Sequence, residues 1–234
     1  MNRNFQTATA TANHGYGVAS ATERNRVLRN TYWLLALSMV PTVMGAWVGI
    51  ATGITRAMSP GIGLVVFLAG AFGFMFAIEK TKNSAAGVPV LLGFTFFMGL
   101  MLSRLLGTVL GLANGASLVM MAFAGTGAIF LGMASLSSVI KRDLTSMGKW
   151  LFIGMIMLLV AGIANFFIQS SALMITLSVL AIGIFSAFIL HDLKRVQDGL
   201  ETNYITATLG VYLSIYNVFQ SLLALFGIFG GREE

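Results

Sequence analysis

The sequence predicts an all-α integral membrane protein, a bundle of seven transmembrane helices. Of its 234 residues, 57% are hydrophobic and only 9% are charged, whereas an ordinary soluble domain has about 25% charged residues. The apolar residues also gather in seven stretches, each close to the roughly 20 residues that cross a bilayer as a helix. The strands of a membrane β-barrel are about half that length and alternate between apolar and polar residues, so a barrel does not fit.

The first region along the chain is a polar tail, residues 1–30. It is rich in Thr, Ala and Asn and ends in the basic segment 23–29. A segment with so little apolar surface cannot bury enough to fold alone, so we expect a disordered cytoplasmic tail with a basic juxtamembrane end. The tail also lacks the apolar core of a signal peptide. We therefore expect the first hydrophobic helix to act as the targeting signal.

The predicted membrane domain covers residues 31–230, and residues 231–234 form a short external end. Short separators with turn-forming residues, such as Ser59-Pro60-Gly61, divide the domain into spans. The expected spans are residues 32–54, 62–78, 88–110, 118–140, 150–169, 172–190 and 205–229. Only Ser170 and Ser171 separate the fifth span from the sixth, which predicts a tight hairpin.

The distribution of basic residues predicts the orientation of the bundle. Eleven of the fourteen Lys and Arg residues lie in the tail or in the even-numbered loops: Arg3, Arg24, Arg26, Arg29, Lys80, Lys82, Lys141, Arg142, Lys149, Lys194 and Arg195. Because cytoplasmic loops carry the excess of Lys and Arg, the N-terminus is expected in the cytoplasm and the C-terminus outside. The net charge of +6 is thereby explained by topology, and no nucleic acid partner is expected.

Small residues repeat at intervals of four inside two of the spans. The repeats are Gly45, Gly49 and Gly53 in the first span, and Ala124, Ala128 and Gly132 in the fourth. Small residues at this spacing let two helix backbones approach closely. The repeats therefore predict either packing within the bundle or a homo-oligomer through these helix faces.

The last span carries a stripe of small and polar residues on one face. Its members, at steps of four and three, are Gly210, Ser214, Asn217, Ser221 and Ala224. Facing lipid, such a stripe would leave hydrogen-bond donors unsatisfied, so it must face protein or water. We infer that the last helix is central. Ser214 and Asn217 then either form hydrogen bonds between helices or line a polar pathway.

Asp192 is the acidic residue to which we assign a pathway or sensor role. Apolar residues continue past it, which places it in the last turns of the sixth helix near the cytoplasmic boundary. The helix dipole disfavours an acidic side chain at this end. The alternative is a solvated aspartate paired with Lys194 or Arg195. The neighbouring His191 is a candidate for sensing pH near neutrality, or is simply solvated.

No pattern of catalytic residues is present, so we do not expect an enzyme. The only histidines are His14 and His191, and cysteine is absent. A metal-binding HExxH helix, a phosphate-binding loop and a GxSxG nucleophile motif are all missing from the sequence. We expect no cofactor and no metal site, with Asp192 at most a weak calcium contact.

Several segments resemble the Bax inhibitor-1 family, and most closely its bacterial YccA-like branch. They are residues 26–32 (RVLRNTY), 93–100 (GFTFFMGL), 191–193 (HDL), 201–205 (ETNYI) and 212–217 (YLSIYN). The resemblance covers nearly the whole chain from Arg26 onward. It implies a seven-helix fold with a central last helix in the bacterial inner membrane, with the C-terminus in the periplasm.

The resemblance implies two alternative functions. In members of the family, two aspartates near the cytoplasmic ends of the last two helices form a pH-responsive pair that gates a calcium leak. Asp192 matches the first aspartate, whereas Ser214 stands at the second position. Members with this sensor also have an arginine at the end of the second helix, where this chain has residues 79–82 (EKTK). Both departures imply weakened or absent pH gating. The YccA-like branch instead implies a regulator that binds a membrane-bound ATP-dependent quality-control protease of the FtsH type.

Overall fold

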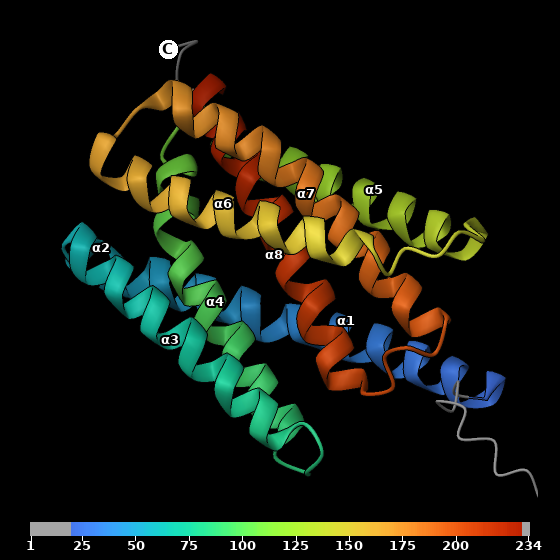
Figure 1. Ribbon diagram of the computed structural model, residues 1–234. Coiled ribbons are helices and arrows are strands. Elements are labelled where there is room, and N and C mark those ends of the chain that lie inside the picture. The colour runs from blue at the N-terminus through green and yellow to red at the C-terminus, as the bar shows by residue number, and fades with distance from the viewer. Residues whose placement is uncertain (1–19, 231–234) are drawn as a thin grey trace, which may run out of the picture.

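The computed structural model describes residues 20–230, and these contain helices and short connections but no strands. The helices are α1 (Ala21–Thr52), α2 (Ile54–Ala57), α3 (Pro60–Thr81), α4 (Gly87–Val109), α5 (Gly115–Val139), α6 (Met147–Ile168), α7 (Ser171–Gln197) and α8 (Tyr204–Gly230). All except α2 are long and apolar enough to cross a membrane. Figure 1 shows them as one bundle. The predicted class, a seven-helix membrane bundle, is confirmed.

The first helix begins earlier than the sequence analysis predicts. The Ser20 hydroxyl accepts the backbone N–H of Glu23 at 3.2 Å, which caps the helix at Ala21. Residues 21–30 are therefore helical, and the tail boundary expected at residue 30 is wrong. The disorder expected for the rest of the tail concerns residues 1–19, which lie outside the described residues, as does the expected external end 231–234. At the other end of α1, Gly53 adopts a left-handed conformation with φ of 66° and separates α1 from the short α2.

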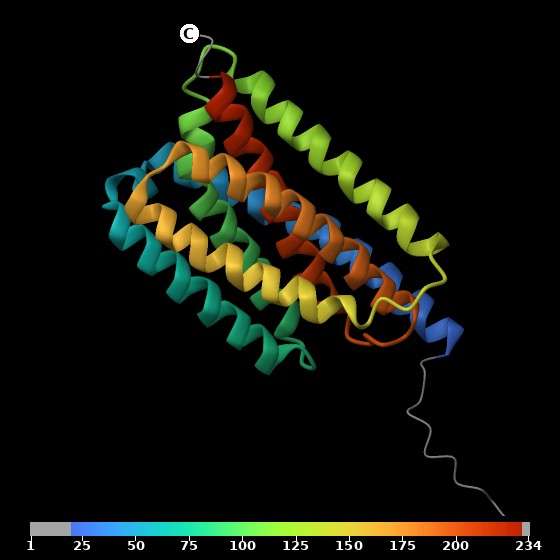
Figure 2. The same cartoon turned by 45° about the horizontal axis from the view of Figure 1, so that its top comes forward.

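Helix α8 occupies the centre of the bundle. It contacts α1, α3, α4, α5 and α7, and two views turned by 45° both show it passing between its neighbours (Figures 1 and 2). Its side chains at Val211, Tyr212 and Leu223 are almost wholly buried. The predicted central position of the last helix is confirmed.

Helices α1 and α4 pack closely because glycines lie between them. A Cβ atom built at Gly45 would lie 2.9 Å from the backbone nitrogen of Leu100, and one at Gly49 would lie 2.5 Å from the Cβ of Ser103. Two members of the repeat in the first span, Gly45 and Gly49, therefore pack within the chain, whereas a Cβ at Gly53 would meet nothing within 4 Å. By contrast, Ala124, Ala128 and Gly132 on α5 are exposed. The homo-oligomer interpretation stays a prediction for that face.

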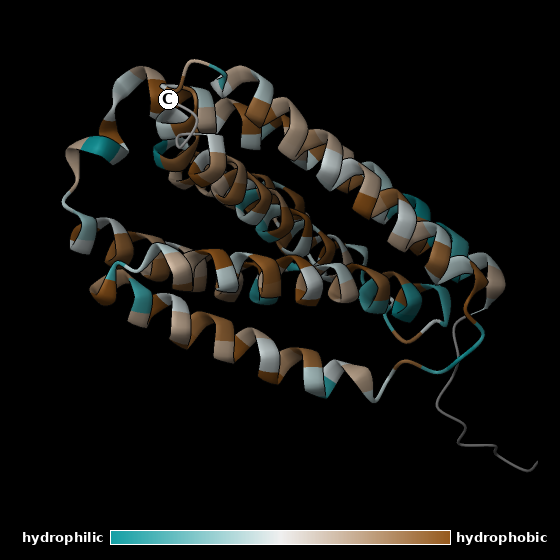
Figure 3. Ribbon diagram, turned by 90° about the horizontal axis from the view of Figure 1, so that it is seen from above, coloured by the Kyte–Doolittle hydropathy of each residue, from teal (hydrophilic) through white to brown (hydrophobic). Residues whose placement is uncertain are grey.

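Helices α3 and α6 lie at the periphery, and each buries only two residues. The remaining apolar side chains on their surfaces are the kind that lipid covers, and Figure 3 shows brown, hydrophobic segments spread over the helices of the bundle. The predicted hairpin between α6 and α7 is confirmed. The Asn165 side chain accepts the backbone N–H of Ser170 at 3.1 Å, and the Ser170 hydroxyl caps α7 by accepting the N–H of Leu173 at 3.3 Å.

Most of the charged residues gather at one end of the bundle, which we call the basic end. It contains the start of α1, the α3–α4 and α5–α6 connections, and the α7–α8 connection. The Arg24 guanidinium donates to the carbonyl of Gln197 at 3.2 Å, and the Asn203 amide donates to the carbonyl of Lys82 at 3.1 Å, which ties these segments together. The opposite end carries Arg56 and Arg104. Which end faces the cytoplasm stays a prediction.

Candidate functional site

Asp192 lies within α7, which continues to Gln197 as the apolar pattern predicts. Its carboxylate packs against α8. A Cβ built at Gly210 would lie 2.7 Å from Asp192 Oδ2, so the absence of a side chain at residue 210 is what admits the carboxylate. The Asp192 side chain is only 18% exposed. It is therefore held between two helices and is not a solvated surface group.

Asp192 pairs with His191 and not with the lysine or arginine that the sequence suggested. His191 Nδ1 and Asp192 Oδ1 are 3.1 Å apart. Lys194 instead bonds to Asp198 at 2.6 Å, and Arg195 lies 4.0 Å from Glu201. The alternative, a pairing with Lys194 or Arg195, does not form, because Lys194 faces another side of the helix and meets Asp198, four positions further along.

His191 is a buried residue, so its expected solvation is also wrong. Its side chain is 8% exposed, and its Nε2 lies 2.7 Å from where a Cβ of Gly148 would stand. Gly148 belongs to the first turn of α6. The site therefore joins three helices: α6 contacts the imidazole, α7 carries the pair and α8 receives the carboxylate.

The polar stripe of α8 faces protein as predicted, since Ser214, Ser221 and Ala224 are buried. The hydrogen bonds differ from the prediction. The Ser214 hydroxyl donates to the Gly210 carbonyl at 3.0 Å, and the Asn217 amide donates to the Leu213 carbonyl at 2.8 Å. Both bonds stay within α8, so the interhelical bonding expected of Ser214 and Asn217 is wrong. Ser214 lies one turn from Gly210 on the same face of α8, and Gly210 is the residue that the Asp192 carboxylate contacts.

Two tyrosines of α8 that lie outside the polar stripe form the interhelical bonds. The hydroxyls of Tyr212 and Thr42 share a hydrogen bond of 2.9 Å, and Tyr212 also donates to the Thr95 carbonyl at 3.4 Å. Tyr216 donates to the Met98 carbonyl at 3.3 Å. These bonds join α8 to α1 and α4. The signal that could have revealed them is the phenol itself, because a buried tyrosine hydroxyl needs a partner.

The remaining acidic groups at the basic end are structural. In the α5–α6 connection, the Thr145 hydroxyl and backbone N–H donate to Asp143 at 2.6 and 2.8 Å. These bonds hold the pKa of the Asp143 carboxyl below its ordinary value. Within residues 20–230, no three His, Asp or Glu side chains are grouped as a metal site requires. The weak calcium contact suggested for Asp192 stays a prediction.

The seven long apolar helices, arranged around a central last helix that contacts a His191–Asp192 pair, define a multi-pass helical membrane protein. The sequence profile of the family described as "Inhibitor of apoptosis-promoting Bax1" matches residues 24–231. The chain therefore belongs to the Bax inhibitor-1 family.

Bacterial relatives match over almost their full length. The chain is 36% identical over 209 residues to the Escherichia coli K12 protein named "Modulator of FtsH protease YccA", covering 89% of this chain and 92% of the relative. It is 36% identical over 211 residues to an uncharacterized membrane protein of Vibrio cholerae, covering 90% and 93%. A protein of Pseudomonas aeruginosa is 37% identical over 217 residues, covering 92% and 95%.

Proposed function

We propose that this chain is an inner-membrane regulator that binds an FtsH-type, ATP-dependent quality-control protease in the same membrane. The observation that carries the proposal is the 36% identity, across 89% of the chain, to a protein named as a modulator of that protease. The name of a second relative, an inner membrane protein of Escherichia coli, supports the location. The eleven basic residues of the tail and even-numbered loops support a cytoplasmic N-terminus.

The polar groups inside the bundle favour a regulator over the alternative, a calcium or cation leak. Ser214 and Asn217 donate to carbonyls of their own helix, and Tyr212 and Tyr216 are bonded to α1 and α4. Groups with these partners serve packing, whereas a pathway needs groups available to replace the hydration shell of an ion. The Escherichia coli relative is named as a modulator of a protease, which supports a role without catalysis.

The test is reconstitution of the full chain with a purified FtsH-type protease and a membrane-protein substrate in liposomes that contain a calcium dye. We expect slower ATP-dependent loss of the substrate when the chain is present, and calcium entry no faster than in vesicles without it. Unchanged proteolysis together with calcium entry well above empty vesicles would reject the regulator and favour the leak.

The N-terminal tail is the segment that we propose contacts the protease. Deleting residues 2–19 leaves the capping Ser20 in place, so α1 should still begin at Ala21 and melting in detergent should be unchanged. We expect copurification with the protease to be lost. A tail of the same composition in scrambled order is the matched control for length and charge. If copurification survives the deletion, the protease contacts the helix bundle and not the tail. A lower melting temperature after the deletion would mean that the tail packs on the bundle.

A further inference from the structure

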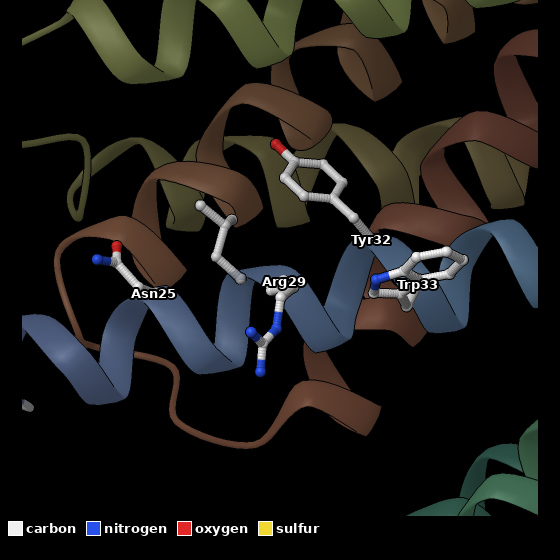
Figure 4. Close-up of a pocket in the computed structure, with 5 residues that line it drawn as sticks. Asn25, Arg29, Tyr32 and Trp33 are labelled. Carbon is white, nitrogen blue, oxygen red and sulfur yellow. The ribbon is translucent and has the colours of Figure 1, made fainter.

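A groove of about 470 Å³ lies along α1 near the basic end. Asn25, Leu28, Arg29, Tyr32 and Trp33 line it, and Figure 4 shows the four labelled side chains projecting from one stretch of α1. Their spacing of three, four, seven and eight residues places them on one side of the helix. The groove therefore runs along about 12 Å of the helix axis at 1.5 Å per residue.

The groove changes from polar to aromatic along its length. Asn25 and Arg29 lie toward the helix start, and Tyr32 and Trp33 lie where the apolar span begins. Tyr32 packs edge-on against Phe130 of α5, with ring centroids 6.3 Å apart and an interplanar angle of 80°. Trp33 is 73% exposed, and tyrosine and tryptophan are enriched at the boundary between headgroups and hydrocarbon. The groove therefore runs from a polar, charged end to an aromatic end, just as a phospholipid runs from its charged headgroup to its apolar acyl chains.

Arg29 supplies an uncompensated positive charge at this boundary. Among residues 20–230, the carboxylates that form ion pairs contact Lys82, His191, Lys194 or Arg195. None of them contacts Arg29. Arg24, by contrast, donates to the carbonyl of Gln197. Arg29 is exposed, and in Figure 4 its guanidinium points away from the Tyr32 ring. A guanidinium with free donors matches the oxygens of a phosphate.

We propose that this groove binds one anionic phospholipid, with its phosphate on Arg29 and Asn25 and its acyl chain along Leu28, Tyr32 and Trp33. A second hollow of about 100 Å³ shares Asn25 and Leu28 and extends to Arg24 and Gln197, which leaves room for the headgroup beyond the phosphate. The proposal concerns α1 alone and does not depend on the protease. A lipid fits better than a peptide because the groove has one charged and one aromatic end.

Trp33 itself can report the lipid. Trp47→Phe with Trp150→Phe leaves Trp33 as the only tryptophan in the full-length protein. In phosphatidylcholine nanodiscs, a small fraction of lipid with brominated chains is added as either phosphatidylglycerol or phosphatidylcholine, and quenching of Trp33 is titrated. We expect brominated phosphatidylglycerol to bind about fivefold more tightly, the factor that about 1 kcal/mol per basic residue gives. In the Arg29→Gln variant, we expect the two brominated lipids to bind with nearly equal affinity.

Two matched controls separate a site from general attraction to a basic surface. Arg26→Gln removes an exposed arginine of the same helix that does not line the groove, and it should keep the preference. Trp33→Phe with Trp150→Phe leaves Trp47, which is 69% exposed on the distant half of α1 and should be quenched equally by both lipids.

Three outcomes would overturn the proposal. Equal quenching of Trp33 by both lipids would mean that no anionic site exists. An equal loss of preference in Arg26→Gln and Arg29→Gln would mean a diffuse basic surface. If deletion of residues 2–19 raised quenching by both lipids alike, the tail and not a lipid would fill the groove. Circular dichroism and gel filtration of each variant exclude misfolding as the cause.

Discussion

The substitution Gly99→Ala tests how closely α1 and α4 approach. A Cβ at Gly99 would lie against the carbonyl oxygen of Thr42, 2.7 Å from its carbonyl carbon and 2.9 Å from its Cα. These are backbone atoms of α1, so no side chain can rotate to make room. Ordinary van der Waals contact for a Cβ begins at 3.4 Å. Helix α1 must therefore shift, and the shift moves Thr42 relative to the Tyr212 hydroxyl, to which it bonds at 2.9 Å.

The expected cost follows from two opposing terms. Overpacking a well-filled interface costs typically 1–3 kcal/mol, and a clash with backbone belongs at the upper end of that range. Replacing glycine by alanine inside a helix recovers about 1 kcal/mol of intrinsic preference. We therefore expect Gly99→Ala to lower the free energy of unfolding by about 2 kcal/mol.

The matched control is Gly127→Ala on α5, where a Cβ would meet nothing within 4 Å. It should raise the free energy of unfolding by up to about 1 kcal/mol through helix preference alone. The measurement is tryptophan fluorescence during SDS titration in mixed micelles for wild type and both variants. The close approach of α1 and α4 would be refuted if Gly99→Ala had the same free energy of unfolding as wild type while Gly127→Ala had the expected higher value.

Three further predictions follow from the bundle. Tyr212→Phe should lower the free energy of unfolding in the same titration by about 1 kcal/mol, because it removes a buried hydrogen bond; no loss would mean that the hydroxyl is not bonded. A reporter active only in the periplasm should be silent when fused after Lys149 and active after Glu234, and activity at Lys149 would reverse the predicted orientation. Ser214→Asp places a second carboxylate beside Asp192, and two ionised carboxylates repel. This variant should melt at a lower temperature near pH 8 than near pH 6, and adding Asp192→Asn should remove the difference. A difference that persisted would point to His191.

Hydropathy and small-residue spacing were sufficient to predict the architecture. The seven apolar stretches became seven helices, and the stripe of α8 predicted its central position because unsatisfied donors cannot face lipid. Gly45 and Gly49 predicted a close helix contact, although the spacing alone could not name α4 as the partner. The start of α1 was missed because hydropathy does not detect a cap: Ser20 and Glu23, three positions apart, carry the signal of a helix N-terminus.

The contacts within the candidate site were harder to predict. Asp192 had three basic or titratable neighbours in sequence, and its choice of His191 depends on how α6 and α8 pack around α7. Gly148 and Gly210 leave the space that the imidazole and the carboxylate fill. A sequence shows that these positions are glycine but not which distant side chain approaches them. The same limit applies to Tyr212, whose partner Thr42 lies 170 positions away.

The distribution of satisfied and unsatisfied groups indicates where a partner of this protein has to bind. In α8 the side chains of Ser214, Asn217, Tyr212 and Tyr216 have partners within the bundle, so these groups can bind a ligand only by breaking existing bonds. The buried hydroxyl of Thr206, near the start of the same helix, has no such partner. Helices α3 and α6 expose mostly apolar surface, which suits lipid or another membrane helix. Arg26 and Arg29, which form none of the ion pairs among residues 20–230, lie at the basic end. In the predicted orientation this end faces the cytoplasm, where the proposed protease and the proposed anionic lipid would both contact the protein. The Arg29→Gln variant and the tail deletion separate the two proposed interactions.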